Sequence, residues 1–196
     1  MSPTRPHPLT DLDPANRPGN NTHHLLIHSF SKHPDSPLLR LARRITDSGC
    51  NLEDARLSTL GGDIVVSARA SGPWDAIAKL ETMLSRLARE DGLQIHAHRT
   101  DSQSKLSNLL PYMVEVVAAD RPGILLALAD FFEGQGIALE SVACSRYQAM
   151  QTGADMFSAQ LTIGIPSDTH IAALRDDFLD FSDRMNLDAI LDPIKF

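Results

Sequence analysis

The pattern of apolar and polar positions divides the chain into two blocks that predict the same order of elements. In the first block, apolar residues recur every three or four positions in two stretches and favour extended structure in four others. Gly49 is a helix stop signal, and Gly61-Gly62-Asp63 is typical of a hairpin turn. The expected elements are strand 24–31, a helix from Leu38 that stops at Gly49, strands 52–60 and 64–70, a helix opened by Ser71-Gly72-Pro73, and strand 93–97.

The second block repeats this order. Its last helix shows the clearest stripe, because Ile171, Leu174, Phe178, Phe181 and Met185 recur at spacings of three and four residues. The expected elements are strand 112–119, a helix from Ile124 that ends at Gly134 and Gly136, strands 138–147 and 155–165, a helix opened by Pro166-Ser167-Asp168, and strand 187–194.

Two βαββαβ units therefore predict an α+β protein with two ferredoxin-like domains, each a four-stranded antiparallel sheet with two helices on one face. The domains are expected at residues 22–100 and 111–196. Residues 1–21 hold five prolines and predict a disordered tail, and the polar stretch 101–110 predicts a linker. Domains this small bury only about 60% of their unfolded surface. Pairing of the two copies, or of two chains in a homo-oligomer, would stabilise them.

Charge and composition narrow the classes of function. The net charge is −7, and it is uneven: residues 22–100 carry ten Lys and Arg against nine Asp and Glu, whereas residues 110–196 carry five against thirteen. Neither half is basic enough to favour direct binding of nucleic acid. No apolar run is long enough for a membrane span, and the two cysteines lie far apart. We expect a reduced, cytoplasmic protein.

The junction of the second block's first strand and helix, Asp120-Arg121-Pro122-Gly123-Ile124, is the candidate site. A helix N-terminus presents unpaired N–H groups and the positive end of the helix dipole, which suits a small carboxylate. Pro122 is compatible with the first helical turn, and Gly123 allows close approach to the backbone. The alternative is purely structural: Asp120 caps the helix and Gly123 relieves crowding.

These residues resemble a known family. A βαββαβ unit with Asp-Arg-Pro-Gly-Ile after its first strand resembles the ACT domain, a sensing module that usually binds amino acids. The first block carries a narrower likeness, to the family of transcriptional repressors of the glycine cleavage system. That likeness rests on the stretches Gly49-Cys50-Asn51-Leu52-Glu53-Asp54-Ala55-Arg56-Leu57, Leu60-Gly61 and Ser71-Gly72-Pro73-Trp74-Asp75-Ala76-Ile77.

The resemblance implies an amino-acid-responsive repressor, with glycine as the ligand, that contacts a transcriptional activator and has no DNA-binding element of its own. The chain is consistent with this because it shows no helix-turn-helix and no basic stripe. No nucleophile, metal-binding or phosphate-loop motif is present, so we expect neither an enzyme nor a cofactor. The alternative is a regulatory subunit that docks on a metabolic enzyme.

The resemblance also implies how a ligand would bind. The carboxylate of the amino acid would lie near the backbone of Gly123 and Ile124, with Arg121 and Pro122 in the same loop. Its ammonium group would face Asp120, or Glu140 from the next strand.

The two copies depart from this pattern in different ways. In the first copy Ser36 replaces the glycine, and Pro37 removes an N–H donor. Conversely, the first copy has Asn51, a useful polar group beside such a loop. Ala138 occupies the matching position in the second copy. Each copy thus holds part of a complete site. This is compatible with a composite site between the copies and also with a loss of amino-acid sensing.

Four histidines form a separate constellation. His24 and His28 lie on the first strand of the first block, and His96 and His98 on its last, so neighbouring strands would bring them onto one face. Two functions are open: a metal site, or a polar sheet face that meets a partner and responds to pH.

Overall fold

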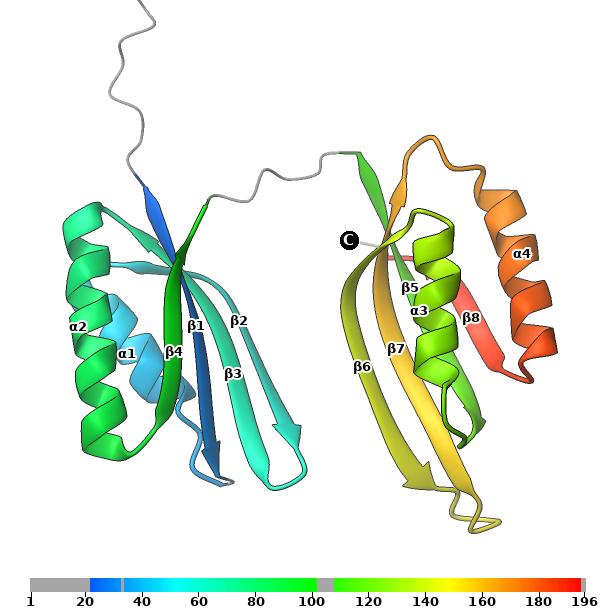
Figure 1. Cartoon of the computed structure of the whole chain (residues 1–196), viewed down its shortest axis with the longest axis horizontal. Coiled ribbons are helices and arrows are strands. Elements are labelled where there is room, and N and C mark those ends of the chain that lie inside the picture. Colours follow the sequence, from blue (N-terminus) through cyan, green and yellow to red (C-terminus); the bar gives the residue numbers. More distant parts are fainter. Residues whose placement is uncertain (1–21, 33, 102–107, 195–196) are drawn as a thin grey trace, which may run out of the picture. The chain divides into compact units, whose positions relative to one another are not determined.

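A computed structural model describes residues 22–32, 34–101 and 108–194 (Figure 1). The chain divides into two compact units between residues 103 and 104, and each unit is treated by itself. The predicted tail 1–21 and most of the predicted linker lie outside the described residues. In the described ranges, none of the helices combines the length and the apolar character that a membrane span requires.

The first unit is a four-stranded antiparallel sheet in the order β2-β3-β1-β4, with two helices. The helices lie on one side of the sheet (Figure 1). The elements are β1 (His23–Lys32), α1 (Leu38–Ser48), β2 (Asn51–Leu60), β3 (Asp63–Gly72), α2 (Trp74–Asp91) and β4 (Gln94–Thr100).

The second unit repeats this topology in the order β6-β7-β5-β8. Its elements are β5 (Leu109–Ala119), α3 (Ile124–Gly134), β6 (Ala138–Gln148), β7 (Asp155–Pro166), α4 (Ile171–Arg184) and β8 (Asp188–Pro193). The predicted α+β class with two ferredoxin-like units is confirmed, as is the order of all the elements.

Several predicted boundaries differ from the structure, and pairing between β5 and β7 explains two of these differences. β5 begins at Leu109, because Leu109 pairs with Pro166 of β7, so the strand takes in the last two residues of the expected linker. The same pairing extends β7 to Pro166, so α4 does not open at 166–168. Instead His170 is its N-cap, and the imidazole Nδ1 accepts a hydrogen bond from the N–H of Ala173 at 3.2 Å.

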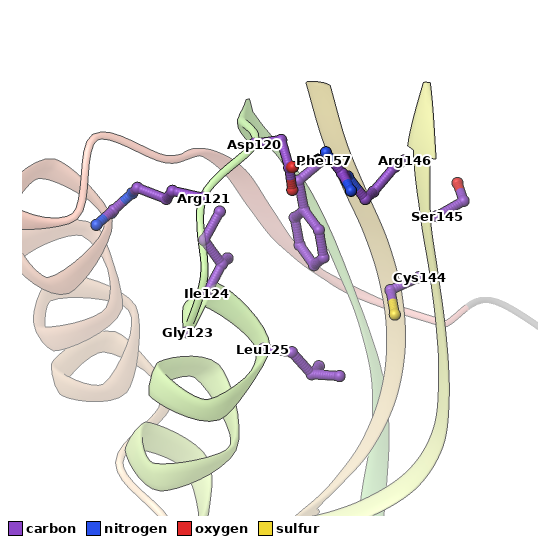
Figure 2. Close-up of a pocket in the computed structure, with 9 residues that line it drawn as sticks. All are labelled: Asp120, Arg121, Gly123, Ile124, Leu125, Cys144, Ser145, Arg146 and Phe157. Atoms are coloured by element: carbon purple, nitrogen blue, oxygen red, sulfur yellow. Dashed lines mark ion pairs between the residues drawn. The ribbon is translucent and has the colours of Figure 1, made fainter. Parts of the chain in front are cut away.

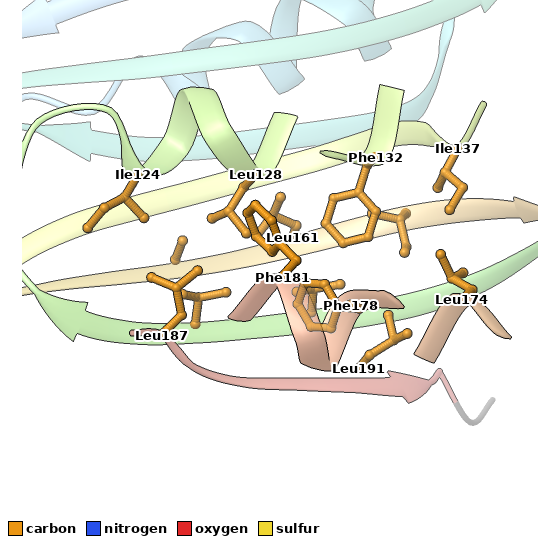
Figure 3. Close-up of a cluster of buried hydrophobic side chains, with 14 of the residues drawn as sticks. Ile124, Leu128, Phe132, Ile137, Leu161, Leu174, Phe178, Phe181, Leu187 and Leu191 are labelled. Carbon is orange, nitrogen blue, oxygen red and sulfur yellow. The ribbon is translucent and has the colours of Figure 1, made fainter. Parts of the chain in front are cut away.

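Buried and exposed residues alternate along the first strand of each unit. This alternation shows which face of the sheet packs against the core. In β1, Leu25 and Ile27 are fully buried on the helix side, and His28 lies on the opposite, open face. The core of the second unit is richer in aromatic residues (Figure 3). The rings of Phe132 and Phe178 lie 5.5 Å apart between α3 and α4, and both side chains are almost completely buried. Each sheet is thus covered on one face by its own helices.

Candidate functional site

The loop between β5 and α3 leaves the start of the helix open. Gly123 is the N-cap residue, with a left-handed backbone at φ 91°, and no side chain makes a capping hydrogen bond. The structure therefore contradicts the alternative in which Asp120 caps α3. Pro122 lies in the turn before the helix instead of its first turn. The first N–H groups of α3 point away from the helix without a side-chain cap, as an anion site requires.

A pocket of about 430 Å³ lies beside this loop (Figure 2). The loop, the first turn of α3, the far end of β6 and the start of β7 contribute its walls. The lining residues are Asp120, Arg121, Gly123, Ile124, Leu125, Cys144, Ser145, Arg146 and Phe157. Its volume is within the range of small-molecule sites, roughly 300–1,000 Å³.

A charged pair stands at the rim of the pocket. Arg146 Nη2 lies 2.6 Å from Asp120 Oδ2, and the carboxylate is much less exposed (17%) than the guanidinium (68%). The backbone N–H of Asp120 is fixed as well, because it donates to the carbonyl of Asp155 at 2.9 Å. Asp120 thus lines the pocket, and its carboxylate faces a cation from β6.

Arg146 lines the pocket but is not among the residues predicted from the sequence. It lies in the same row of the sheet as Phe157 of β7 and Ala118 of β5, two residues before Asp120. Only strand pairing brings it there, because 26 residues separate Arg146 from Asp120 along the chain. No local motif marks it.

Arg121 has a structural contact. Its guanidinium donates a hydrogen bond to the backbone carbonyl of Met185, at the C-terminal end of α4. Figure 2 shows the side chain running from the loop toward that helix and away from Asp120. A cation is favoured at a helix C-terminus. Arg121 thus ties the loop to α4.

The structure does not bring Glu140 to the pocket within the second unit. Ala138, two residues before Glu140, pairs with Gly164, which pairs with Pro111 near the start of β5. The pocket lies at the other end, where β5 runs into Asp120. Asn51 is the first residue of β2 and belongs to the first unit.

In the first unit, side chains of the matching loop contact the helix that follows it, α1. Ser36 Oγ accepts a hydrogen bond from the N–H of Leu38 at 3.4 Å. Arg40 on α1 pairs with Asp35 at 2.9 Å and with Asp91 at 3.1 Å. These contacts occupy groups that a ligand would use, and the N-cap residue is Pro37.

The histidines lie on the open face of the first sheet, as their spacing predicted. The rings of His28 and His98 are 6.3 Å apart, but His28 Nδ1 is hydrogen-bonded to Ser67 Oγ at 3.0 Å. His24 is buried, with Nδ1 3.3 Å from Glu53. The described ranges contain no cluster of three or more His, Cys, Asp or Glu that could hold a metal ion.

Comparison with known proteins agrees with this architecture. Residues 24–98 match the family model of the ACT domain, and the second unit repeats the same ferredoxin-like topology. The first unit thus matches the ACT domain, and the second unit shares its fold.

The similarity to one kind of regulator extends over most of the chain. The glycine cleavage system transcriptional repressor of Escherichia coli K12 is 22% identical over 177 residues, which cover 90% of this chain and 93% of that protein. The repressor of the same name from Shigella flexneri matches equally.

Solved structures show the same fold. The crystal structure of a candidate glycine cleavage system transcriptional repressor has a TM-score of 0.70 at 21% identity, over 89% of this chain and 99% of that one. An unknown protein from Galdieria sulphuraria has a TM-score of 0.69 at 17% identity, with the same coverage.

Proposed function

We propose that this chain is an amino-acid-responsive regulator that represses glycine cleavage genes through contact with a transcriptional activator. It acts without binding DNA and without catalysis. Glycine is the first candidate ligand because the relatives are named as repressors of the glycine cleavage system. The observation that best supports binding of an amino acid is the pocket at the uncapped start of α3.

The pocket offers groups for both ends of an amino acid. The free N–H groups in the first turn of α3, together with the exposed guanidinium of Arg146, suit a carboxylate. The carboxylate of Asp120 lies beside them and suits an ammonium group. Of the predicted set, we keep Asp120, Gly123 and Ile124 as ligand-binding residues.

Charge supports contact with a protein over contact with DNA. Residues 110–196 carry a net charge of −8, counted as five Lys and Arg against thirteen Asp and Glu. Such a surface repels phosphate groups and is complementary to a basic protein partner.

The edge strands favour a homo-oligomer. β2 and β6 are 10 and 11 residues long, and nearly all their residues are exposed. An unpaired edge of this length tends to pair with another strand. We therefore propose that these edges meet a second copy, which sedimentation of the purified chain would detect as a dimer or larger assembly.

Ligand binding is tested by thermal denaturation of the full chain with each of the common amino acids at millimolar concentration. A ligand at 100 times its dissociation constant stabilises a protein by about 2.7 kcal/mol. A rise in melting temperature with one amino acid or a few supports sensing. The absence of a rise with all of them would refute it.

A pair of variants at Gly123 tests whether this pocket is responsible. Gly123→Asp places a carboxylate beside the ligand's own carboxylate, and it should abolish the response. Gly123→Asn has nearly the same shape without the charge, and both residues tolerate a left-handed backbone. The asparagine variant should keep more of the response than the aspartate variant, whereas an unchanged response in both variants would place binding elsewhere.

The regulatory step is tested by affinity capture from the native cell. Recovery of a DNA-binding activator, and its release by the stabilising amino acid, would support the proposal. Recovery of a metabolic enzyme whose activity changes on binding would favour the alternative, a regulatory subunit.

A further inference from the structure

We propose that the open face of the first sheet in one copy of this chain packs against the open face of the second sheet in another copy. The open face is the side of each sheet that its own helices leave uncovered. The inference rests on the proposed homo-oligomer, because it names a surface through which two copies meet. This surface is distinct from the edges of β2 and β6.

The open face of the first sheet carries the histidines. His28 on β1 lies opposite His96 on β4, and the ring of His98 lies 6.3 Å from that of His28. His96 and His98 are exposed. The Lys and Arg side chains of this face each have a carboxylate partner, at 2.6 to 3.9 Å: Lys32 with Asp63, Arg56 with Asp54, and Arg69 with Glu53. The exposed imidazoles are therefore the groups that carboxylates of a partner would meet.

The open face of the second sheet has the opposite charge. Glu115 of β5 lies between two buried valines and therefore points to the open face. Asp188 and Asp192 of β8 are exposed, and they pair with residues of β5 on that face, Val117 and Met113. Within the described strands of this sheet, none of the paired positions on the open face holds Lys, Arg or His. This face therefore suits a cationic partner.

The contrast falls at matching positions of the repeat. His28 and Glu115 are separated by the same number of residues as the glycines that end the first helix of each unit, Gly49 and Gly136. Pairing of like faces would bring carboxylates against carboxylates, which is unfavourable. Pairing of unlike faces brings imidazoles to carboxylates, and a nearby carboxylate favours the charged form of a histidine. Charge thus selects the unlike pair.

Both faces also carry apolar side chains among these polar groups. Leu26 of β1 lies opposite His98, and Met113 of β5 lies opposite Asp192. Ile190 lies opposite Glu115 and is 53% exposed. A partly apolar patch with polar groups around it is the usual composition of an interface between proteins. The apolar residues would supply affinity, and the charges would choose the partner face.

Unlike faces can meet twice in a symmetric dimer. When the first unit of one copy meets the second unit of another, a two-fold axis brings the remaining two faces together in the same way. The two contacts are then identical. A substitution on either face therefore acts on both contacts of the dimer.

Charge reversal and mixing test the inference, with sedimentation of the purified full chain as the measurement. One variant combines Glu115→Lys with Asp188→Lys, and the other combines His96→Glu with His98→Glu. Each variant alone places like charges in both contacts, and it should weaken association by about tenfold or more. An equimolar mixture has one contact with the original residues and one with reversed charges. It should therefore associate nearly as well as the unsubstituted chain.

The control combines Asp180→Lys with Asp183→Lys, which makes the same change of charge at exposed positions of α4 and should leave association unchanged. An oligomer of unchanged size in both face variants would leave the edges of β2 and β6 as the interface and overturn this inference alone. Weakened association that mixing does not restore would also overturn it. A chain that stays monomeric at every concentration would overturn both this inference and the proposed homo-oligomer.

Discussion

Glu53 and Glu140 occupy the same position in the two repeats but have different surroundings. Each is the extra residue of a β-bulge, at register shifts between residues 52 and 54 and between residues 139 and 141. Glu53 Oε2 lies 3.3 Å from His24 Nδ1 and 3.3 Å from Arg69 Nε. Glu140 is exposed, and no ion pair to it is present in the described ranges.

Glu53→Gln should therefore destabilise the first unit. His24 is buried and Arg69 is mostly buried, with 22% of its side chain exposed, so the variant leaves a cation without its partner charge. The two contacts are ion pairs without hydrogen-bond geometry, so a loss of about 1 kcal/mol is expected in urea unfolding. The control is Glu140→Gln at the matching bulge, which should change the free energy of unfolding by less than about 0.5 kcal/mol. Equal losses in the two variants would mean that the contacts of Glu53 contribute nothing.

Gly123→Ala should destabilise the second unit through the backbone alone. Gly123 has φ 91°, yet a Cβ there would meet no atom within 4 Å. The expected cost is about 1–2 kcal/mol, which is the penalty for an L-residue in the left-handed region. Gly134→Ala, at the end of the same helix, also meets open space but is not at positive φ. It should be neutral or stabilise by up to about 1 kcal/mol. A neutral Gly123→Ala in thermal denaturation would contradict the left-handed geometry.

Phe132→Ala should be the more damaging of two substitutions in α3. Phe132 is fully buried and packs against Phe131 and Phe178, with ring centroids at 5.1 and 5.5 Å. Loss of the ring leaves a cavity, so a cost of about 3–5 kcal/mol is expected. Leu126 lies on the same helix but is 65% exposed, and Leu126→Ala should cost less than about 1 kcal/mol. Chemical denaturation measures the loss of stability in each variant. A loss in Leu126→Ala as large as that in Phe132→Ala would contradict the prediction.

Features set by a few adjacent residues were predictable from the sequence. Gly49 was expected to stop a helix, and it does so with φ 88° and an N–H that donates to the carbonyl of Thr46. The start of α4 was not predictable in this way. Its position depends on pairing between Leu109 and Pro166, which are distant in sequence.

The same distinction applies to the candidate site. Asp120 to Ile124 form one local loop, and a strand followed by a glycine and a helix is visible in the sequence. Arg146 reaches Asp120 only through the register of β6 on β7. Glu140 was chosen for its charge and its place on the next strand, but the parallel course of β5 and β6 puts it at the opposite end.

The ion pair between Glu81 and Arg99 should make the stability of the first unit depend on acid pH. Arg99 donates from Nε and Nη2 to the two carboxylate oxygens of Glu81, both at 2.9 Å. The hydrogen bond and the positive charge of Arg99 hold the pKa of Glu81 below its ordinary value of 4.5. A carboxyl whose pKa is lower in the folded state contributes stability that is fully present above the unfolded value. That contribution is lost as the pH falls through the folded pKa.

Glu81→Gln should accordingly lower the melting temperature by a small amount near pH 7, and the difference from the unsubstituted chain should vanish at acid pH. The effect should also weaken in high salt, because Glu81 and Arg99 are both partly exposed. Thermal denaturation between pH 3 and pH 7 measures it. Glu90→Gln removes an exposed carboxylate from the same helix, without breaking an ion pair in the described ranges, and serves as the control. A difference for Glu81→Gln that grows toward acid pH would have the wrong sign for this ion pair.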